Sequence, residues 1–295
     1  MKEMWRVAAI QMAVGTDKEQ NVRTACEKVR KTVSEKAACA EKPDFVILPE
    51  MFHCPYVTER FPDYAEPEGG PVRQALSVCA AENGIYLIAG SVPERDEEGK
   101  IYNTSYVFGR DGALLARHRK MHLFDIAVEG GQHFQESKTL TAGTDCTVFE
   151  TEFGPMGVCI CYDLRFPELT REMALRGART VFVPAAFNMT TGPAHWEVTF
   201  RARALDNQIY LVGCAPARDE NGPYVSWGHS IAVNPWGEVL GQLDEKEGVL
   251  TVDMDGKKEE AVRKQLPLLR HRRTDLYRLE WEKVPDMFGQ GKKES

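Results

Sequence analysis

The sequence contains no apolar run of 18 residues, the length that a membrane-spanning helix needs. Near the N-terminus, Arg6 and Gln11 interrupt the apolar stretch, so the continuous hydrophobic segment of a secretory signal is missing. The net charge is −7, and no long block of Lys and Arg occurs before the extreme C-terminus. We therefore expect a cytoplasmic protein that binds neither a membrane nor a nucleic acid.

The sequence also lacks the usual signatures of disulfide, metal and nucleotide sites. Its eight cysteines are not clustered, and in a long chain without a secretion signal we expect reduced thiols. Cys159 and Cys161 form a C-x-C pair, but no second Cys or His pair at zinc spacing follows, so we expect no metal site. Neither a G-x-G-x-x-G nor a P-loop motif is present.

Apolar runs typical of buried strands alternate with segments of helical periodicity. With 43% hydrophobic residues, the chain can form a sizeable core. No repeat or linker divides it, so we expect one domain over residues 1–284 and a polar tail over residues 285–295. The predicted strands are residues 7–12, 44–48, 85–90, 102–109, 114–119, 156–160, 180–185, 209–215, 225–233, 239–243 and 249–252. The predicted helices are residues 17–40, 71–81, 167–177, 194–207 and 257–265.

This order of segments indicates a layered α/β fold in which helices cover β-sheets. Asp111-Gly112 between two strand-like runs is a hairpin signal, and residues 225–252 are typical of a meander. We therefore expect mixed rather than purely parallel sheets. Residues 121–137 are predicted to form a long polar loop, and a loop of this length inside a compact domain is usually functional.

Three reactive side chains, Glu50, Lys120 and Cys161, each follow a predicted strand directly. Strand ends are where layered α/β folds gather functional groups. A carboxylate can take a thiol proton and return it to a leaving amine, while an ammonium can stabilise the oxyanion that forms when a thiolate attacks a carbonyl. The three groups together would suffice for acyl transfer without a histidine.

Cys161 lies where the strand 156–160 turns into a helix that begins at Pro167. The partial positive charge of a helix N-terminus favours a thiolate, and such a turn would present the thiol at a strand end. The alternative is that Cys161 is simply one more buried cysteine, since free Cys is among the most buried residue types.

The other candidates also have plain structural alternatives. Glu50 alone could be a surface carboxylate, and Lys120 belongs to the charged run R-H-R-K, which is compatible with a solvated segment. His195 and His229 could form a Cys–His pair, but no papain-like or caspase-like signature surrounds the cysteine. We expect His122 to orient neighbouring loop groups.

The segments L-P-E-M-F, R-K-M-H-L-F-D and C-Y-D-L-R-F-P-E resemble, in this order, the three signatures of the nitrilase superfamily of carbon–nitrogen hydrolases. The resemblance implies a four-layer α-β-β-α sandwich with mixed sheets that assembles as a homodimer. It also implies that Glu50 is the general base, that Lys120 stabilises the tetrahedral intermediate and that Cys161 is the nucleophile. Glu136, in F-Q-E-S, matches the second glutamate of the superfamily, which lies beside the lysine.

Within the superfamily, F-Q-E-S-K-T-L and F-N-M-T-T-G-P-A-H-W-E are similar to the omega-amidase group. The similarity implies that Arg165, Phe187 and Thr191 hold the carboxylate end of the substrate. The residues themselves support this for Arg165, because a guanidinium four residues after the nucleophile can bind a carboxylate in a fork. The alternative for Arg165 is a structural ion pair at the start of the helix.

The resemblance thus implies hydrolysis of the terminal amide of a small 2-oxo dicarboxylate monoamide, such as α-ketoglutaramate or α-ketosuccinamate, through a Cys161 thioester. The backbone N–H of Tyr162 would assist Lys120 at the oxyanion, and no cofactor is expected. Two alternatives remain open. The chain could be another amidase of the superfamily, such as a deaminated glutathione amidase or an N-carbamoyl hydrolase, or it could be a catalytically silent binding scaffold.

Overall fold

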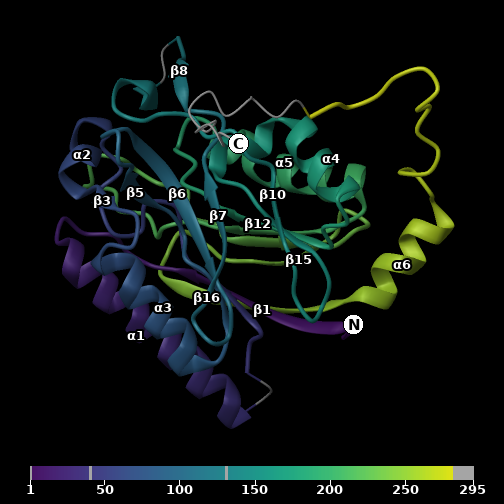
Figure 1. The fold of residues 1–295 in the computed structure, drawn as a ribbon, viewed down its shortest axis with the longest axis horizontal. Coiled ribbons are helices and arrows are strands. Elements are labelled where there is room, and N and C mark those ends of the chain that lie inside the picture. The colour runs from purple at the N-terminus through teal and green to yellow at the C-terminus, as the bar shows by residue number, and fades with distance from the viewer. Residues whose placement is uncertain (1, 40–41, 130–131, 282–295) are drawn as a thin grey trace, which may run out of the picture.

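The computed structural model describes residues 2–39, 42–129 and 132–281, which form four layers in the order α-β-β-α (Figure 1). In the first sheet, parallel pairs join β1, β2 and β4, and antiparallel pairs extend it at both sides. Its strand order is β16 (Gly248–Asp255), β1 (Met4–Gln11), β2 (Phe45–Ile47), β4 (Tyr86–Ile88), β6 (Ile101–Phe108), β5 (Val92–Arg95) and β3 (Glu66–Pro67), with β7 (Leu114–Arg119) also paired to β6.

The second sheet is mixed as well, which confirms the expectation from the hairpin signals. Its central strands β11, β12 and β13 are parallel, while β10, β14 and β15 pair in antiparallel fashion. The strand order is β10 (Thr147–Phe149), β11 (Met156–Val158), β12 (Thr180–Pro184), β13 (Tyr210–Cys214), β14 (Ile231–Val233) and β15 (Val239–Gln242).

Helices cover the outer face of each sheet, and Figure 1 shows the two helical layers on opposite sides of the sheets. The side chain of Asp17 accepts the backbone N–H of Gln20 at 2.9 Å, so it caps the N-terminus of the first long helix. Gly84, with φ +57°, ends the second one in the left-handed conformation. The helices are α1 (Lys18–Cys39) and α3 (Pro71–Asn83) on the first sheet, α4 (Pro167–Leu175) and α5 (Gly192–Asn207) on the second, and the peripheral α2 (Phe61–Tyr64) and α6 (Gly256–Gln265).

The alternation of side chains along β1 explains the layering. Ala8 and Ile10 pack into the core beneath α1 and α3, whereas Val7 and Ala9 pack into the core between the two sheets. Because both faces of the strand are covered, its sequence is apolar almost throughout. This arrangement confirms the predicted four-layer sandwich.

Two predicted segments are wrong in detail. Residues 121–137 are not a plain loop, because β8 (Asp125–Ala127) and β9 (His133–Gln135) pair there as a two-stranded sheet. The expected meander is also interrupted: β14 and β15 form a hairpin, but β16 leaves it and pairs with β1 along eight residues. The long strand β1 gives β16 a full-length partner.

The strand predicted over 225–233 begins only at Ile231. Gly228 and His229 before it have φ values of +72° and +61°, which a strand does not tolerate. No helix among the residues that the structure describes is long and apolar enough to span a bilayer. The predicted tail, residues 285–295, lies outside the described residues.

Candidate active site

Four of the predicted site residues meet at one edge of the sandwich, and all four are buried. Glu50 follows β2, Lys120 follows β7 and Cys161 follows β11, so three strand ends from two sheets converge there. Glu136 reaches the same place from the 3-10 turn Glu136–Lys138, directly after β9. The supposed loop 121–137 therefore delivers one member of the cluster.

Lys120 lies between the two glutamates. Its Nζ is 2.9 Å from Oε1 of Glu50 and 2.9 Å from Oε1 of Glu136. Burial lowers the pKa of Lys120, but the carboxylates of Glu136 and Glu50 outweigh it and hold the pKa above its ordinary value. The side chain is therefore a fixed ammonium at neutral pH.

The two oxygens of Glu50 have different surroundings. Oε1 accepts hydrogen bonds from Asn103 Nδ2 at 2.8 Å and from Lys120, and the Tyr56 hydroxyl lies 3.1 Å away. Oε2 has no hydrogen-bond partner among the described residues. Burial raises the pKa of Glu50, although Lys120 opposes this rise, and the thiol of Cys161 interacts with the same carboxyl group. A buried carboxyl group with one open oxygen and a raised pKa is suited to moving protons.

Cys161 occupies a strained turn. Its φ is +47°, a left-handed value that is uncommon for a residue with a side chain. It begins a 3-10 helix, Cys161–Arg165, that the sequence did not predict and that separates β11 from α4. Burial and the carboxylate of Glu50 raise the pKa of the Cys161 thiol well above its ordinary value. The thiol therefore needs a base.

Backbone groups surround the thiol. Tyr162 is the second residue of the 3-10 helix, and the first N–H groups of such a turn have no partner within it. The backbone of Ala186, at the end of β12, also interacts with the Cys161 sulfur. The sequence argument named Tyr162 and missed Ala186, because nothing local distinguishes an alanine whose backbone faces a thiol.

Arg165 is partly buried beside the cluster. Its guanidinium lies over the ring of Phe187, 4.5 Å from the ring centroid, and its Nη1 is 2.9 Å from Nδ1 of His195. No acidic side chain among the described residues pairs with it, so the alternative of a structural ion pair finds no support. Burial lowers the pKa of the Arg165 guanidinium, and Cys161 is close enough to act on it electrostatically.

Phe187 and Thr191 are placed less directly. Phe187 is buried, with its ring edge-on to Trp196, and the Arg165 guanidinium packs on the face of this ring. Thr191 donates its hydroxyl to Oδ1 of Asn188 at 3.1 Å, and its backbone N–H goes to the same oxygen at 2.9 Å. The Thr191 hydroxyl can therefore accept a further hydrogen bond more readily than donate one.

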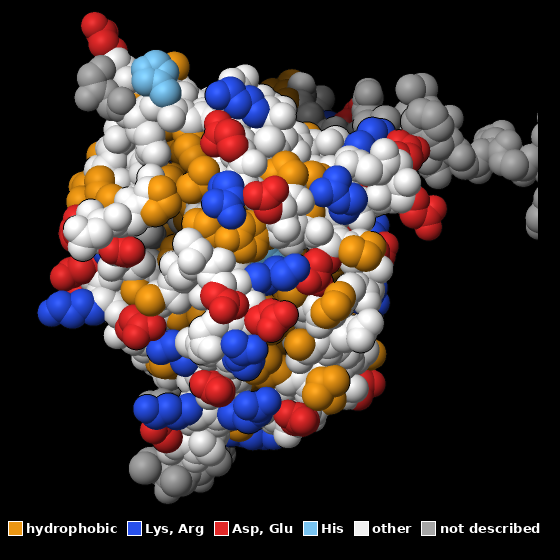
Figure 2. All heavy atoms as spheres, turned by 90° about the vertical axis from the view of Figure 1, so that its left-hand side faces the viewer, with side chains coloured by type: hydrophobic (Ala, Val, Ile, Leu, Met, Phe, Trp, Pro, Cys, Tyr) orange, Lys and Arg blue, Asp and Glu red, His pale blue; other side chains and the backbone are white. Residues whose placement is uncertain are grey.

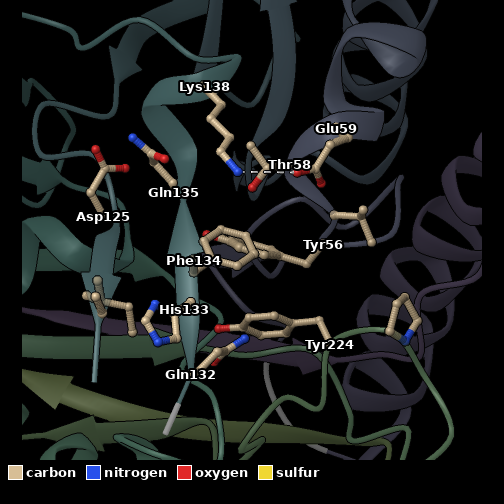
Figure 3. Close-up of a pocket in the computed structure, with 14 residues that line it drawn as sticks. Tyr56, Thr58, Glu59, Asp125, Gln132, His133, Phe134, Gln135, Lys138 and Tyr224 are labelled. Atoms are coloured by element: carbon tan, nitrogen blue, oxygen red, sulfur yellow. Dashed lines mark ion pairs between the residues drawn. The ribbon is translucent and has the colours of Figure 1, made fainter. Parts of the chain in front are cut away.

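Two cavities adjoin the cluster. The larger, of about 680 Å³, extends along β9 and ends at the rings of Tyr56, Phe134 and Tyr224, as Figure 3 shows. The smaller, of about 420 Å³, has Glu50 in its lining. Tyr56 and Tyr224 line both, and their rings pack against each other at an angle of 35° with centroids 4.6 Å apart. Aromatic rings thus separate an outer vestibule from the buried charges.

Sequence reasoning missed Tyr56 and Asn103. Tyr56 joins the two glutamates, since its hydroxyl is 2.7 Å from Oε1 of Glu136 as well as near Glu50. It lies in an irregular segment whose sequence carries no periodic signal. Asn103 is one of three consecutive polar residues in β6, I-Y-N-T-S-Y-V-F, so nothing local distinguishes it as the one that bonds to Glu50.

This combination of a four-layer sandwich with a glutamate, a lysine and a cysteine at converging strand ends defines a class of enzymes. Residues 6–264 match the carbon-nitrogen hydrolase family, and the chain belongs to it. Among sequence relatives, the omega-amidase NIT2 of Mus musculus is 49% identical over 279 residues, which cover 95% of this chain and 99% of the relative. Omega-amidase NIT2 of Homo sapiens is 48% identical over the same length, with the same coverage of both chains.

Solved structures of the superfamily have the same fold. Nit3 of Saccharomyces cerevisiae, a member of branch 10 of the nitrilase superfamily, superimposes with a TM-score of 0.84 at 37% identity, covering 92% of this chain and 98% of its own. A glutamate-to-leucine mutant of the amidase from Nesterenkonia sp. AN1 has a TM-score of 0.76 at 26% identity, covering 93% of this chain and 96% of its own. Its active-site cysteine carries the acetamide moiety of fluoroacetamide, added covalently.

Proposed function

We propose that this carbon–nitrogen hydrolase is an omega-amidase that converts α-ketoglutaramate or α-ketosuccinamate to the 2-oxo dicarboxylate and ammonia. The observation that carries the proposal is Arg165, a partly buried cation with no acidic partner among the described residues, beside the cluster of Glu50, Lys120 and Cys161. A cation in this position suits a substrate whose carboxylate is remote from its amide. The names of the relatives agree with it.

The mechanism begins with proton transfer from the Cys161 thiol to Oε2 of Glu50, the oxygen that accepts no hydrogen bond from any residue that the structure describes. The thiolate attacks the amide carbon, and the oxyanion is stabilised by the Lys120 ammonium and by the N–H of Tyr162. Glu50 then returns the proton to the leaving nitrogen, which departs as ammonia and leaves a thioester. In the second half, Glu50 deprotonates a water molecule that attacks the thioester, and the acid and the free thiol are released.

Each neighbour of Glu50 has a part in this cycle. Lys120 and Asn103 hold Oε1, so that Oε2 is the oxygen that exchanges protons. Burial raises the pKa of Glu50, which makes the carboxyl group a stronger base for the thiol proton. Glu136 shares the charge of Lys120 and fixes its position, and Phe124 N donates to Oε2 of Glu136 at 2.7 Å. Phe187 packs against the Arg165 guanidinium, whereas the Thr191 hydroxyl is donated to Asn188 and would have to turn away from it to donate to a substrate carboxylate.

The test is the rate of ammonia release from α-ketoglutaramate compared with deaminated glutathione and with an N-carbamoyl amino acid. We expect kcat/KM to be highest for α-ketoglutaramate. A preference for either of the other substrates would assign the chain to that neighbouring activity instead. Absence of turnover for all three, combined with an unreactive Cys161, would leave the binding scaffold as the better description.

We also propose that the enzyme is a cytoplasmic homodimer that binds no nucleic acid or membrane. An apolar strip formed by α5 and the adjoining β14–β15 turn supports a dimer, because Val198 and Leu205 on the helix are 59% and 42% exposed and Trp236 in the turn is 49% exposed. On the face in Figure 2, acidic and basic side chains are interspersed, which does not favour a polyanion. Light scattering of the wild type and of Val198→Asp tests the dimer: we expect the mass of two chains, reduced by the substitution.

A further inference from the structure

Asp163, two residues after Cys161, is a fully buried carboxylate that none of the catalytic steps uses. Its Oδ1 accepts the backbone N–H groups of Met121 at 3.2 Å and of His122 at 2.9 Å, and it lies 2.8 Å from Nδ1 of His122. Its Oδ2 accepts the N–H of Ile160 at 3.0 Å and lies 3.0 Å from Nε2 of His118. Both oxygens are therefore fully occupied by donors.

These donors come from the two segments that carry the reactive groups. Met121 and His122 follow Lys120 directly, and His118 lies two residues before it on β7. Ile160 immediately precedes Cys161. One carboxylate thus bonds to both sides of the lysine and to the residue before the cysteine, and it joins the end of a strand in the first sheet to the end of a strand in the second.

The histidines are themselves held in place. The ring of His122 stacks on Phe166 with centroids 3.7 Å apart and an interplanar angle of 10°. His118 is buried, and its Nδ1 is 2.9 Å from the hydroxyl of Thr147 on β10. Burial alone would raise the pKa of Asp163, but hydrogen bonds from His118, from His122 and from the Ile160 backbone hold it well below its ordinary value. The group is therefore an anion at neutral pH.

We propose that Asp163 is a positioning residue that sets the distance and angle between the Cys161 thiol and the Lys120 ammonium. This inference rests on the proposed function, since it assigns Cys161 and Lys120 their parts in the reaction. The strained turn at Cys161 needs such an anchor, because a positive φ persists only where surrounding contacts fix it. The bond from Ile160 is the one that holds the backbone immediately before that turn.

Asp163→Asn is the informative substitution. The side chain keeps its shape, but an NH₂ group replaces one oxygen and faces donors instead of accepting from them. His118 can compensate by changing its tautomer, because its two ring nitrogens can exchange roles between the side chain and Thr147. The backbone N–H of Ile160 has no such freedom and loses its acceptor. The turn at Cys161 is therefore loosened while the fold is kept.

The experiment measures three quantities for wild type and Asp163→Asn: kcat and KM for α-ketoglutaramate, the rate at which fluoroacetamide adds to Cys161 by mass spectrometry, and the melting temperature. We expect kcat to fall at least about tenfold, less than the roughly 10²–10³-fold loss seen when an oxyanion donor is removed outright, with KM changed by less than about threefold. The rate of addition to Cys161 should fall in parallel. A kcat and an addition rate within about twofold of the wild-type values would overturn the inference.

Glu259→Gln is the matched control. Glu259 is as buried as Asp163 and is ion-paired to Arg179 at 2.7 Å and Arg263 at 2.9 Å, on segments that carry none of the four clustered residues. We expect a lower melting temperature with kcat and the addition rate unchanged. Equal losses of activity in both variants at equal loss of stability would show that Asp163 acts only on the fold.

A second variant covers the case in which Asp163→Asn does not fold. His122→Phe keeps an aromatic ring against Phe166 and removes only the Nδ1 contact to Asp163. We expect a partial loss, about threefold to tenfold in kcat, with little change in KM.

If the wild type adds fluoroacetamide but does not hydrolyse α-ketoglutaramate, the proposed substrate is wrong and the addition rates still decide the inference. If wild-type Cys161 does not react either, the proposed function fails and the inference with it.

Discussion

Glu50 and Asp163 are both fully buried carboxyl groups next to the same cysteine, yet their surroundings differ in one respect. Every donor around Asp163 is matched to one of its oxygens, and its pKa is held low. Glu50 has three neighbours on Oε1 and none on Oε2 among the described residues, and burial raises its pKa. The comparison teaches that a saturated carboxylate anchors the structure, whereas one left half-satisfied can exchange a proton.

The largest expected loss of activity comes from replacing the Cys161 thiol, whose proton Oε2 of Glu50 accepts. Cys161→Ala should abolish turnover and leave the fold largely intact, because the change is small. Cys161→Ser should be nearly as inactive, since a hydroxyl is harder to ionise than a thiol beside a carboxylate base. Ammonia release measures both.

The matched control is Cys159→Ser, two residues earlier and equally buried, which should cost stability rather than chemistry. Retention of more than about a tenth of the rate by Cys161→Ser would contradict covalent catalysis by the thiol.

Glu50→Gln should cause the second-largest loss of activity, because it replaces the carboxylate by an amide that cannot accept the thiol proton. General acid–base catalysis contributes about 10²–10⁴-fold, and Glu50 acts in both half-reactions, so we expect a loss near the upper limit. Acyl-enzyme formation, followed by mass spectrometry, should stop. An acylation rate close to that of the wild type would remove Glu50 from the mechanism and erase the difference from Asp163.

Lys120→Met removes the ammonium that donates a hydrogen bond to Oε1 of Glu50. Loss of one oxyanion donor costs about 10²–10³-fold in kcat in other enzymes. Two buried carboxylates would also lose their counter-ion, which typically destabilises a protein by about 3–5 kcal/mol. Steady-state kinetics and urea unfolding separate the two effects. Activity near the wild-type level in folded Lys120→Met would exclude an oxyanion role.

Arg165→Ala should act on substrate choice rather than on the proton path. Leaving a substrate carboxylate without its partner costs about 2–5 kcal/mol at a buried site, so KM for α-ketoglutaramate should rise strongly. A neutral short amide such as butyramide never uses the guanidinium and should be affected little. Equal losses on both amides would mean that Arg165 is structural, and the omega-amidase assignment would weaken to an unspecified amidase.

The smallest effect is the pH dependence of stability. Because the folded pKa of Asp163 lies below its ordinary value of 3.8, the carboxylate contributes stability above that pH and loses it as the pH falls towards the folded pKa. The difference in unfolding free energy between wild type and Asp163→Asn should therefore be constant from pH 7 to about 5 and shrink below pH 4. A difference that grows on acidification would contradict the assigned ionisation.

The sequence predicted the reactive groups better than their surroundings. Glu50, Lys120 and Cys161 follow strands whose apolar runs are readable, so their meeting at strand ends could be inferred. Tyr56 bonds to Glu50 from only six positions away, but in an irregular segment without a periodic signal. Asn103 bonds to Glu50 from 53 positions away, a separation that no local pattern encodes. The contacts between Asp163 and Lys120's neighbours join residues about forty positions apart, and only the packing of two sheets brings them together.

The fold follows the same division. The long strands and helices have clear periodicity, and their layering was predicted correctly. The three-residue strands β8 and β9 are too short to show alternation, so they were taken for a loop. The pairing of β16 with β1 depends on competition between two sheet edges, which the pattern of either strand alone does not decide.

At Cys161 the backbone conformation favours glycine, whereas the reaction requires a thiol side chain. Glycine adopts this conformation without the steric cost that any side chain meets, so a population selected for thermal stability alone would be driven towards glycine at position 161. Such a lineage would gain a more relaxed turn and lose its nucleophile in one step. A cysteine at this backbone geometry therefore carries a steric cost that folding alone does not require, and the chemistry of the thiol accounts for it.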